Sequence, residues 1–148
     1  MQLTLYSDYS LRVLFYLNQT PKDTATIIEI SDFYEISKNH LVKVVHGLVQ
    51  LGFIISTRGK GGGIKLARSS EKISIGEVVR KTEPHFNLVE CFNKKTNRCS
   101  ITDACRLKKI LHQGMEAFFS ILDQYTLAEG SKIILKKQIG NHLDLHNS

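Results

Sequence analysis

Apolar side chains recur at helical spacing in three successive segments at the start of the chain. These segments run from Ser7 to Asn18, from Thr26 to Tyr34 and from Ser37 to about Leu51, with apolar residues three and four apart. A polar stretch, Thr20–Asp23, separates the first two, and Gly52 follows the third at a position where helices commonly end. The pattern therefore predicts three short helices.

The periodicity changes from helical to alternating after Gly52. Residues 53–57 are rich in strand-forming types, and residues 64–67 alternate apolar with polar. Between them, Arg58 to Gly63 contains four glycines in six residues. We expect a β-hairpin with a flexible, cationic tip. Three helices followed by such a hairpin outline a winged helix-turn-helix, in which the third helix can enter a DNA major groove.

The second half of the chain predicts one short and one long helix. Ser74–Arg80 forms the short helix, and Asp103 can cap the long one, which runs to about Tyr125. The apolar stripe of the long helix is wide for so small a protein. It either packs on its own domain or pairs with a second copy of the chain, and we favour a homodimer. The stripe contains Leu107, Ile110, Leu111, Met115, Phe118, Ile121, Leu122 and Tyr125.

The expected fold class is mainly α with a small β-hairpin. We divide the chain into a winged helix-turn-helix over residues 1–82, a loop over 83–105, a long C-terminal dimerisation helix over 106–128 and a tail over 129–148. The tail has some apolar content at Ile133–Leu135 but no clear function.

Charge is distributed unevenly along the chain. Lysine and arginine total 20 and aspartate and glutamate total 14, which gives a formal net charge of +6. No acidic residue occurs from Ser37 through Ser70. A long segment with basic residues and no acidic ones is typical of a surface that binds a polyanion such as DNA. A solvated basic surface would have the same composition.

The first residues do not resemble a secretory signal peptide. They lack a basic n-region and a small-residue cleavage site, and Asp8 and Arg12 interrupt the apolar run. No apolar stretch is long enough to cross a bilayer. We therefore expect a cytoplasmic protein that binds no membrane and keeps its thiols reduced.

Side chains that could read DNA stand at the start of the third predicted helix. Asparagine can pair with adenine and lysine with guanine, while serine can bind a base or a phosphate. Ser37 also suits a plain N-cap, the lysines could be ordinary surface residues, and His40 could be a partly buried structural histidine. The candidates are Ser37, Lys38, Asn39, His40 and Lys43.

Three further candidates lie at the hairpin tip. Arg58, Gly59 and Lys60 suit a minor groove, because its negative potential attracts arginine and glycine lets the backbone come close. The glycines lack the spacing and the strand–loop–helix context of a phosphate-binding loop, so we set nucleotide binding aside.

All three cysteines lie in one segment. Cys91, Cys99 and Cys105 are separated by seven and five residues. Zinc sites usually contain closely spaced cysteine pairs, which are missing here. The wider gaps favour a loop around an iron–sulfur cluster, with a redox thiol pair and a chance grouping as alternatives. A fourth ligand could be His85, Glu90, Asp103, His112 or a residue distant in sequence.

Several stretches of the chain resemble the iron–sulfur winged-helix regulators of bacteria. They are LTLYSDYSLRVLFYL, SKNHLVKVVHGL, RGKGGGIKL, IGEVVRKTEP and the three-cysteine loop followed by RLKKIL. Within this family, the chain is most similar to the nitric-oxide-sensing NsrR-type repressors, over residues 2 to about 128. The resemblance implies a homodimer with one cluster per subunit. It also implies that Cys91, Cys99 and Cys105 ligate the cluster together with Asp8 of the other subunit.

Two features separate the chain from the related IscR-type regulators. Those proteins use a histidine three residues after the third cysteine, where this chain has Lys108, and their two cysteine gaps are usually equal. We expect a 4Fe–4S cluster, with 2Fe–2S as the alternative. Asp8 and Arg12 also have the spacing of a helical ion pair. Loss of the cluster could therefore free Asp8 to pair with Arg12, which makes Arg12 a candidate switch residue.

The resemblance implies a cluster-dependent repressor that binds a palindromic double-stranded DNA operator. Nitric oxide would attack the cluster, release the DNA and induce genes for nitric oxide detoxification and nitrosative stress. A thiol- or cluster-status regulator of the same fold, insensitive to nitric oxide, is the first alternative. A cluster-bearing redox or adaptor protein is the second. We expect no enzyme, because no nucleophile–base constellation supports catalysis and His112 is only weakly placed to pair with Cys105.

Overall fold

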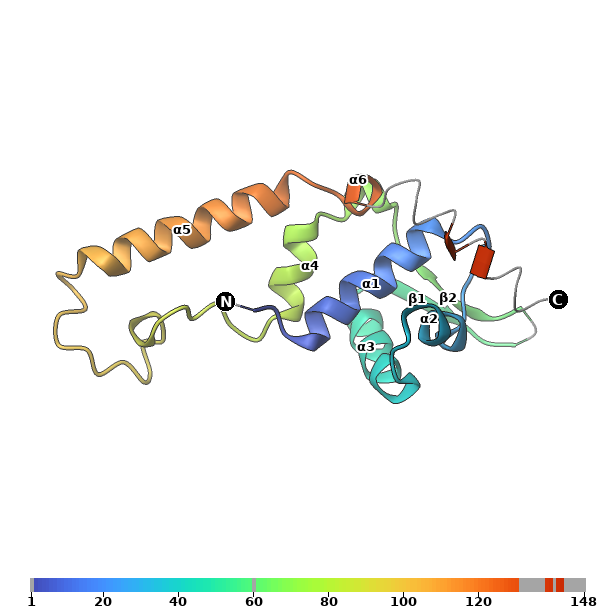
Figure 1. Ribbon diagram of the computed structural model, residues 1–148, viewed down its shortest axis with the longest axis horizontal. Helices are drawn as coiled ribbons and strands as arrows, with labels where there is room; N and C mark the ends of the chain where they lie inside the picture. The colour runs from blue at the N-terminus through green and yellow to red at the C-terminus, as the bar shows by residue number, and fades with distance from the viewer. Residues whose placement is uncertain (1, 60, 131–137, 140, 143–148) are drawn as a thin grey trace.

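The computed structural model describes residues 2–59, 61–130, 138–139 and 141–142, and its described part is mainly helical with one two-stranded antiparallel sheet (Figure 1). This agrees with the expected fold class. None of the described helices is long and apolar enough to span a membrane. The elements are α1 (Leu5–Gln19), α2 (Ile27–Tyr34), α3 (Lys38–Gln50), β1 (Ile54–Thr57), β2 (Gly63–Leu66), α4 (Ile75–Thr82), α5 (Arg106–Asp123) and α6 (Leu127–Gly130), with short 3₁₀ turns at Ser70–Lys72 and Glu90–Phe92.

The first two helices begin at side chains that cap them. The hydroxyl oxygen of Thr4 accepts the backbone N–H of Ser7 at 3.2 Å and so caps α1. Thr26 and Glu29 form a capping box at the start of α2, in which each side chain accepts a backbone N–H of the other residue. Glu35 then adopts a left-handed conformation, with φ of 53°, where the chain turns from α2 into α3.

The hydrophobic core lies where α1 packs against the other helices and the hairpin. We call residues 2–82 the body. Val13, Leu14 and Tyr16 of α1 are fully buried there. Helix α3 turns one apolar stripe into the core, as the helical spacing of its apolar residues predicted; the buried residues of this stripe are Leu41, Val44, Val45 and Leu48. The remaining core residues are Leu17 of α1, further residues of the body, and Leu127 and Ile139.

The hairpin is an antiparallel pair in which Ile54 faces Leu66 and Thr57 faces Gly63. Ala25, just before α2, adds a further bridge to Ile64 of β2, with N–O distances of 3.0 and 2.8 Å. The inner side of the hairpin is buried in the core, so the tip projects from a fixed base.

Helix α5 extends away from the body like an arm, and the loop that precedes it lies at the far end (Figure 1). Of its residues, only Phe119 is buried. Several large apolar side chains of this region are at least half exposed: Leu107 60%, Ile110 52%, Ile121 55% and Tyr125 50%. The arm therefore carries an apolar face that its own body leaves uncovered.

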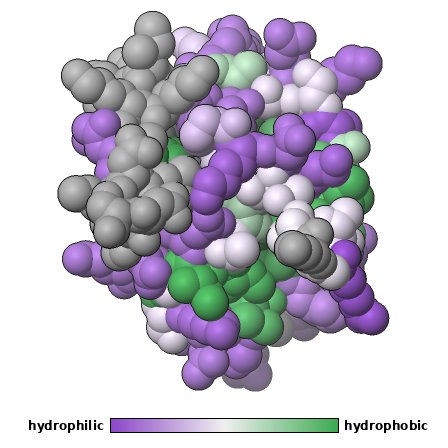
Figure 2. All heavy atoms as spheres, turned by 90° about the vertical axis from the view of Figure 1, so that its right-hand side faces the viewer, coloured by the Kyte–Doolittle hydropathy of each residue, from purple (hydrophilic) through white to green (hydrophobic). Residues whose placement is uncertain are grey.

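Helix α5 differs from the prediction in its N-cap residue. It begins at Arg106, after an N-cap at Cys105, whereas we expected Asp103 to cap it. It ends at Asp123, and a separate short helix, α6, follows. The apolar tail stretch Ile133–Leu135 lies outside the described residues. The opposite end of the molecule from the arm is mainly hydrophilic, with scattered hydrophobic patches (Figure 2).

Candidate nucleic-acid interface and metal centre

The outward face of α3 presents the polar side chains that the sequence predicted for it. Lys38, Asn39, His40 and Lys43 are all exposed. Ser37 occupies the N-cap position, and its carbonyl accepts the N–H of His40 at 3.0 Å. Its side chain makes no capping hydrogen bond, so the predicted cap position is confirmed without the predicted cap contact.

His40 is exposed and is not the partly buried structural histidine that we had considered. Its ring lies 6.3 Å, centroid to centroid, from the ring of Tyr9 on α1. The start of α3 therefore touches the same helix that carries Asp8 and Arg12.

The hairpin tip has the backbone geometry that its glycines predict. Gly59 and Gly61 have φ values of +99° and +81°, a region that favours glycine. A Cβ at Gly62 would overlap the carbonyl oxygen of Thr57. Arg58 and Gly59 are exposed at the tip, and Lys60 lies outside the described residues. The tip can thus approach a neighbouring surface with its backbone.

The cysteine loop, residues 83–105, joins α4 to α5. Its three thiols are free; Cys99 is exposed, and Cys91 and Cys105 are half-buried. Among the described residues, no group of three or more His, Cys, Asp or Glu side chains is close enough to hold a metal ion. The structure therefore does not bring the three cysteines and Asp8 of one chain together.

The chemistry of these donors nevertheless fits an iron–sulfur cluster. Three free thiols on one segment are the ligand type that such clusters take. The loop is held by local hydrogen bonds, such as that from the Arg98 N–H to Glu90 at 2.7 Å, and contains only one short 3₁₀ turn. The cysteines can therefore draw together without breaking a helix or a strand.

Cys105 has a second role at the start of α5. Its sulfur accepts the backbone N–H of Lys108 at 3.4 Å and so takes the capping role that we had assigned to Asp103. Amide dipoles at a helix start stabilise negative charge, which is the charge that a cysteine ligand carries.

Asp8 and Arg12 form the ion pair that their spacing predicted. The Arg12 guanidinium donates two hydrogen bonds to the Asp8 carboxylate, at 3.1 and 2.8 Å. The hydrogen bond to Asp8 raises the pKa of Arg12. The guanidinium carbon also lies 5.8 and 5.9 Å from the ring centroids of Tyr9 and Tyr34. Arg12 thus links Asp8 to the ring that touches His40.

The sequence reasoning missed two long-range contacts, one at the start of the loop and one at the C-terminal end of α5. The Glu83 carboxylate accepts the backbone N–H and hydroxyl of Thr4, at 2.7 and 3.0 Å. Partial burial raises the pKa of Glu83, but hydrogen bonds from Ser7 and Thr4 outweigh it and lower the pKa overall. The start of the loop is therefore tied to the N-terminal cap of α1.

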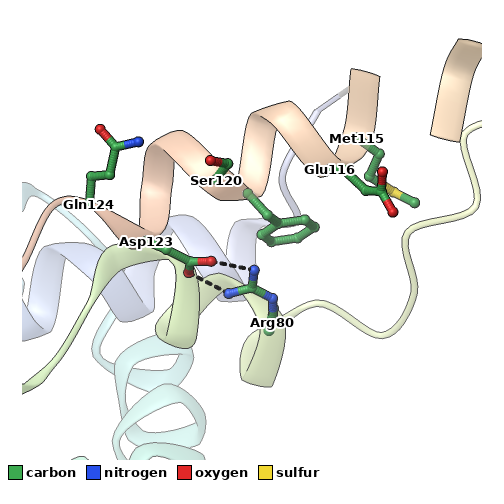
Figure 3. Close-up of a pocket in the computed structure, with 7 residues that line it drawn as sticks. Arg80, Met115, Glu116, Ser120, Asp123 and Gln124 are labelled. Atoms are coloured by element: carbon green, nitrogen blue, oxygen red, sulfur yellow. Dashed lines mark hydrogen bonds and ion pairs between the residues drawn. The ribbon is translucent and has the colours of Figure 1, made fainter. Parts of the chain in front are cut away.

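At the other end of α5, Arg80 of α4 reaches the carboxylate of Asp123 with two hydrogen bonds, at 2.5 and 2.6 Å (Figure 3). The Arg80 guanidinium also lies 4.2 Å from the ring centroid of Phe119. A Cβ at Gly76 would overlap the Asp123 carboxylate, so α4 and α5 approach closely here. We call Arg80, Phe119 and Asp123 the α4–α5 clamp.

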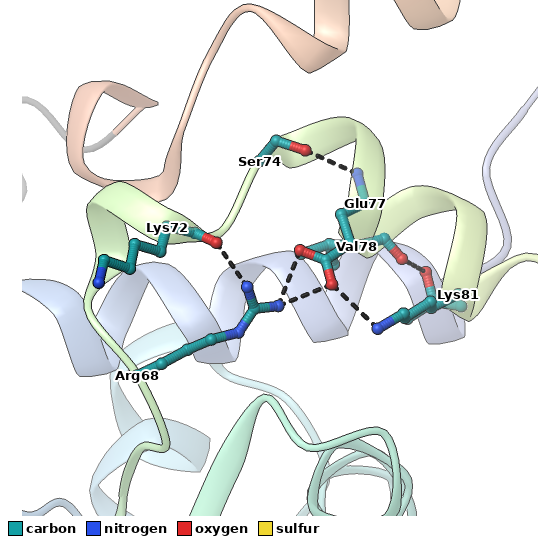
Figure 4. A network of polar contacts seen from close by, with 7 residues as sticks. Arg68, Lys72, Ser74, Glu77, Val78 and Lys81 are labelled. Carbon is teal, nitrogen blue, oxygen red and sulfur yellow. Dashed lines mark hydrogen bonds and ion pairs between the residues drawn. The ribbon is translucent and has the colours of Figure 1, made fainter.

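A third network joins the end of the hairpin to α4. Arg68 donates to both carboxylate oxygens of Glu77 at 2.7 Å and to the carbonyl of Lys72, while Lys81 donates to Glu77 at 2.9 Å (Figure 4). The hairpin, α4 and α5 are therefore connected in series by charged side chains.

The comparisons with known proteins agree with this architecture. The model of the Rrf2 family, described as an iron-dependent transcriptional regulator, matches residues 3–130. The chain is 50% identical over 130 residues to the HTH-type transcriptional regulator NsrR of Shouchella clausii, covering 87% of each chain. It is also 50% identical to NsrR of Bacillus subtilis, covering 87% of this chain and 89% of that protein.

Solved structures share the fold at lower identity. The oxidised form of CymR from Staphylococcus aureus matches with a TM-score of 0.69 at 22% identity, covering 89% of this chain and 97% of that chain. IscR from T. potens matches with a TM-score of 0.62 at 20% identity, covering 87% and 85%. The family match and the relatives at 50% identity show that the chain belongs to the Rrf2 family of transcriptional regulators, which are not enzymes.

Proposed function

We propose that this chain is a cytoplasmic, nitric-oxide-responsive repressor that binds DNA as a homodimer while it holds an iron–sulfur cluster. The observation that carries the proposal is the presence of three free thiols on one loop, in a chain that also exposes the polar face of α3 and the hairpin tip. The start of the loop is connected to the body through Glu83, and its end continues into α5, whose far end the α4–α5 clamp holds. The similarity to NsrR proteins supports nitric oxide as the signal.

The DNA-binding part of the proposal rests on α3 and the hairpin. The start of α3 enters the major groove, where Asn39 and Lys43 face base edges and Ser37 and Lys38 face phosphates or bases. Arg58 and the glycine backbone at the hairpin tip follow the adjacent minor groove. No carboxylate in the run from Ser37 through Ser70 opposes this approach.

The homodimer rests on the uncovered apolar face of α5. Ile110 and Ile121 lie three turns apart on this face and are both more than half exposed. A second copy of the same helix can cover them, and two reading helices then address the two halves of a palindromic operator.

The proposed cluster is held by Cys91, Cys99 and Cys105, with Asp8 of the other subunit as the fourth ligand, and 4Fe–4S is the preferred type. When bound, the cluster supplies iron that reacts with nitric oxide. Asp8 cannot ligate iron and pair fully with Arg12 at once. Release of Asp8 therefore restores the ion pair that the structure contains and shifts Arg12 relative to Tyr9 and the start of α3.

An absorption spectrum of the anaerobically purified protein tests this function. We expect cluster bands that change on addition of nitric oxide, together with loss of DNA binding. In Asp8→Ala, the bands and the nitric oxide response should differ from the parent, whereas Asp23→Ala, an exposed loop variant, should behave like the parent. A colourless zinc protein with the same DNA affinity would contradict the proposal. A response to peroxide but not to nitric oxide would favour the thiol- or cluster-status alternative.

A further inference from the structure

The DNA-reading face of α3 contains an apolar side chain among its polar ones. Val42 is 45% exposed, although the other apolar residues in the first two turns of the helix are buried. It lies one helical turn after Lys38 and one turn before His46, and Lys43 follows it directly. Val42 is therefore in the middle of the surface that the proposed function places in the major groove.

The described residues of the chain leave nearly half of the surface of Val42 uncovered. On the same helix, Leu41 and Val44 point into the core, whereas the neighbours of Val42 on its own face are charged or polar and exposed. A valine in a helix has one strongly preferred χ1 rotamer. Its methyl groups are consequently held in place before any partner arrives, and little side-chain entropy is lost on contact.

The major groove offers such a side chain one apolar group of matching size. Thymine alone carries a methyl group there, whereas cytosine has only a hydrogen at the same ring position and the purines present the N7 acceptor. A valine over a polar base edge would remove water from it without replacing the hydrogen bond, which costs free energy. The same side chain thus favours thymine and disfavours its competitors.

We propose that Val42 is a specificity-determining residue, which contacts the methyl group of a thymine in each half of the operator. This inference rests on the proposed DNA-binding function and deepens it. Val42 would add an apolar contact to the polar contacts that Asn39 and Lys43 make with the bases. The base opposite Val42 would then have to be thymine.

The test uses the whole 148-residue chain, purified anaerobically, and a DNA duplex selected by that chain from a random pool. Each thymine of one half-site is then replaced in turn by deoxyuridine, which lacks only the methyl group. At one thymine, we expect affinity to fall about fourfold, the factor that corresponds to one buried methyl-sized group. Val42→Ala should bind the parent duplex about as weakly as the parent protein binds that deoxyuridine duplex. For this variant, deoxyuridine at the same position should cause no further loss of affinity.

Val49→Ala is the matched control, because Val49 is also exposed on α3, at 39%, but lies near the C-terminal end of the helix. This variant should keep the full deoxyuridine effect. The inference is overturned if the selected DNA binds but no thymine is sensitive, or if the deoxyuridine loss persists unchanged in Val42→Ala. Failure to select any duplex is a different result, which overturns the proposed function together with the inference.

Discussion

At the scale of single residues, Cys105 combines two roles that substitutions can separate. Its sulfur caps α5, and it is one of the three proposed cluster ligands. Serine is a good helix N-cap but a poor iron ligand, whereas alanine can do neither. Cys105→Ser and Cys105→Ala should therefore both lose the cluster, while only the alanine variant also loosens the first turn of α5.

Hydrogen exchange of the Lys108 amide in the metal-free protein measures the capping role. We expect the serine variant to protect this amide more than the alanine variant, by about 1 kcal/mol in local opening free energy. Ser100→Ala, an exposed change in the same loop, serves as the control. Equal protection in both Cys105 variants would rule out a capping contribution.

The sequence predicted side-chain contacts only where spacing within a helix determines them. Asp8 and Arg12 were predicted as a pair because four residues of a helix bring them together, and the structure confirms it. Thr4 and Glu83 are 79 residues apart, and Arg80 and Asp123 are 43 apart. Such pairs depend on how helices pack, which no local pattern contains. The cluster ligands and the DNA contacts stay predictions, because each requires a partner.

At the scale of elements, the network around Glu77 fixes the end of the hairpin to α4. Burial raises the pKa of Glu77, but hydrogen bonds from Arg68 and Lys81 outweigh it, so the pKa lies below its usual value. A carboxylate with a lowered folded-state pKa stabilises the fold above its unfolded pKa of about 4.3. That stability is lost as the pH falls through the folded value.

Glu77→Gln should therefore be less stable than the parent at pH 7, by about 1 kcal/mol for a half-exposed, charge-assisted contact. The difference should shrink progressively below about pH 4.3 as the parent carboxylate is protonated. Urea unfolding at several pH values measures it, with the exposed Glu71→Gln as the charge-matched control. A difference that is constant with pH would show that the charge of Glu77 is not its cause.

Element types were predictable because the apolar period differs between helix and hairpin. The first and last residues of each element were harder to predict, and α5 shows the reason. We expected Asp103 as its cap, but the sulfur of Cys105 fills that place, and cysteine is not among the residues that usually mark a helix start. The four-residue α6 was not predicted, since a single turn is too short for a period to be recognised.

At the scale of the whole molecule, the exposed apolar face of α5 makes assembly testable without any ligand. Ile110→Glu places a charge on this face and should convert a dimer into monomers in analytical ultracentrifugation, because a buried unpaired charge opposes association. Ser120→Glu adds the same charge on the polar side of the same helix and should leave the dimer intact. A parent protein that is already monomeric would contradict the proposed dimer.

The α4–α5 clamp has a mechanical consequence for the arm that it holds. With 18 residues and a rise of about 1.5 Å per residue, α5 is roughly 27 Å long. The clamp holds the last turn of α5, and the cysteine loop joins its first turn. The helix can therefore act as a rigid lever that pivots at Arg80. A sideways movement of about 2 Å at Cys105 corresponds to a rotation of roughly 4° about Arg80, given that length. A small rearrangement around the three cysteine sulfur atoms would therefore rotate α5 slightly about the clamp. The clamp would pass this rotation to α4 and to the hairpin that Arg68 and Glu77 attach to α4.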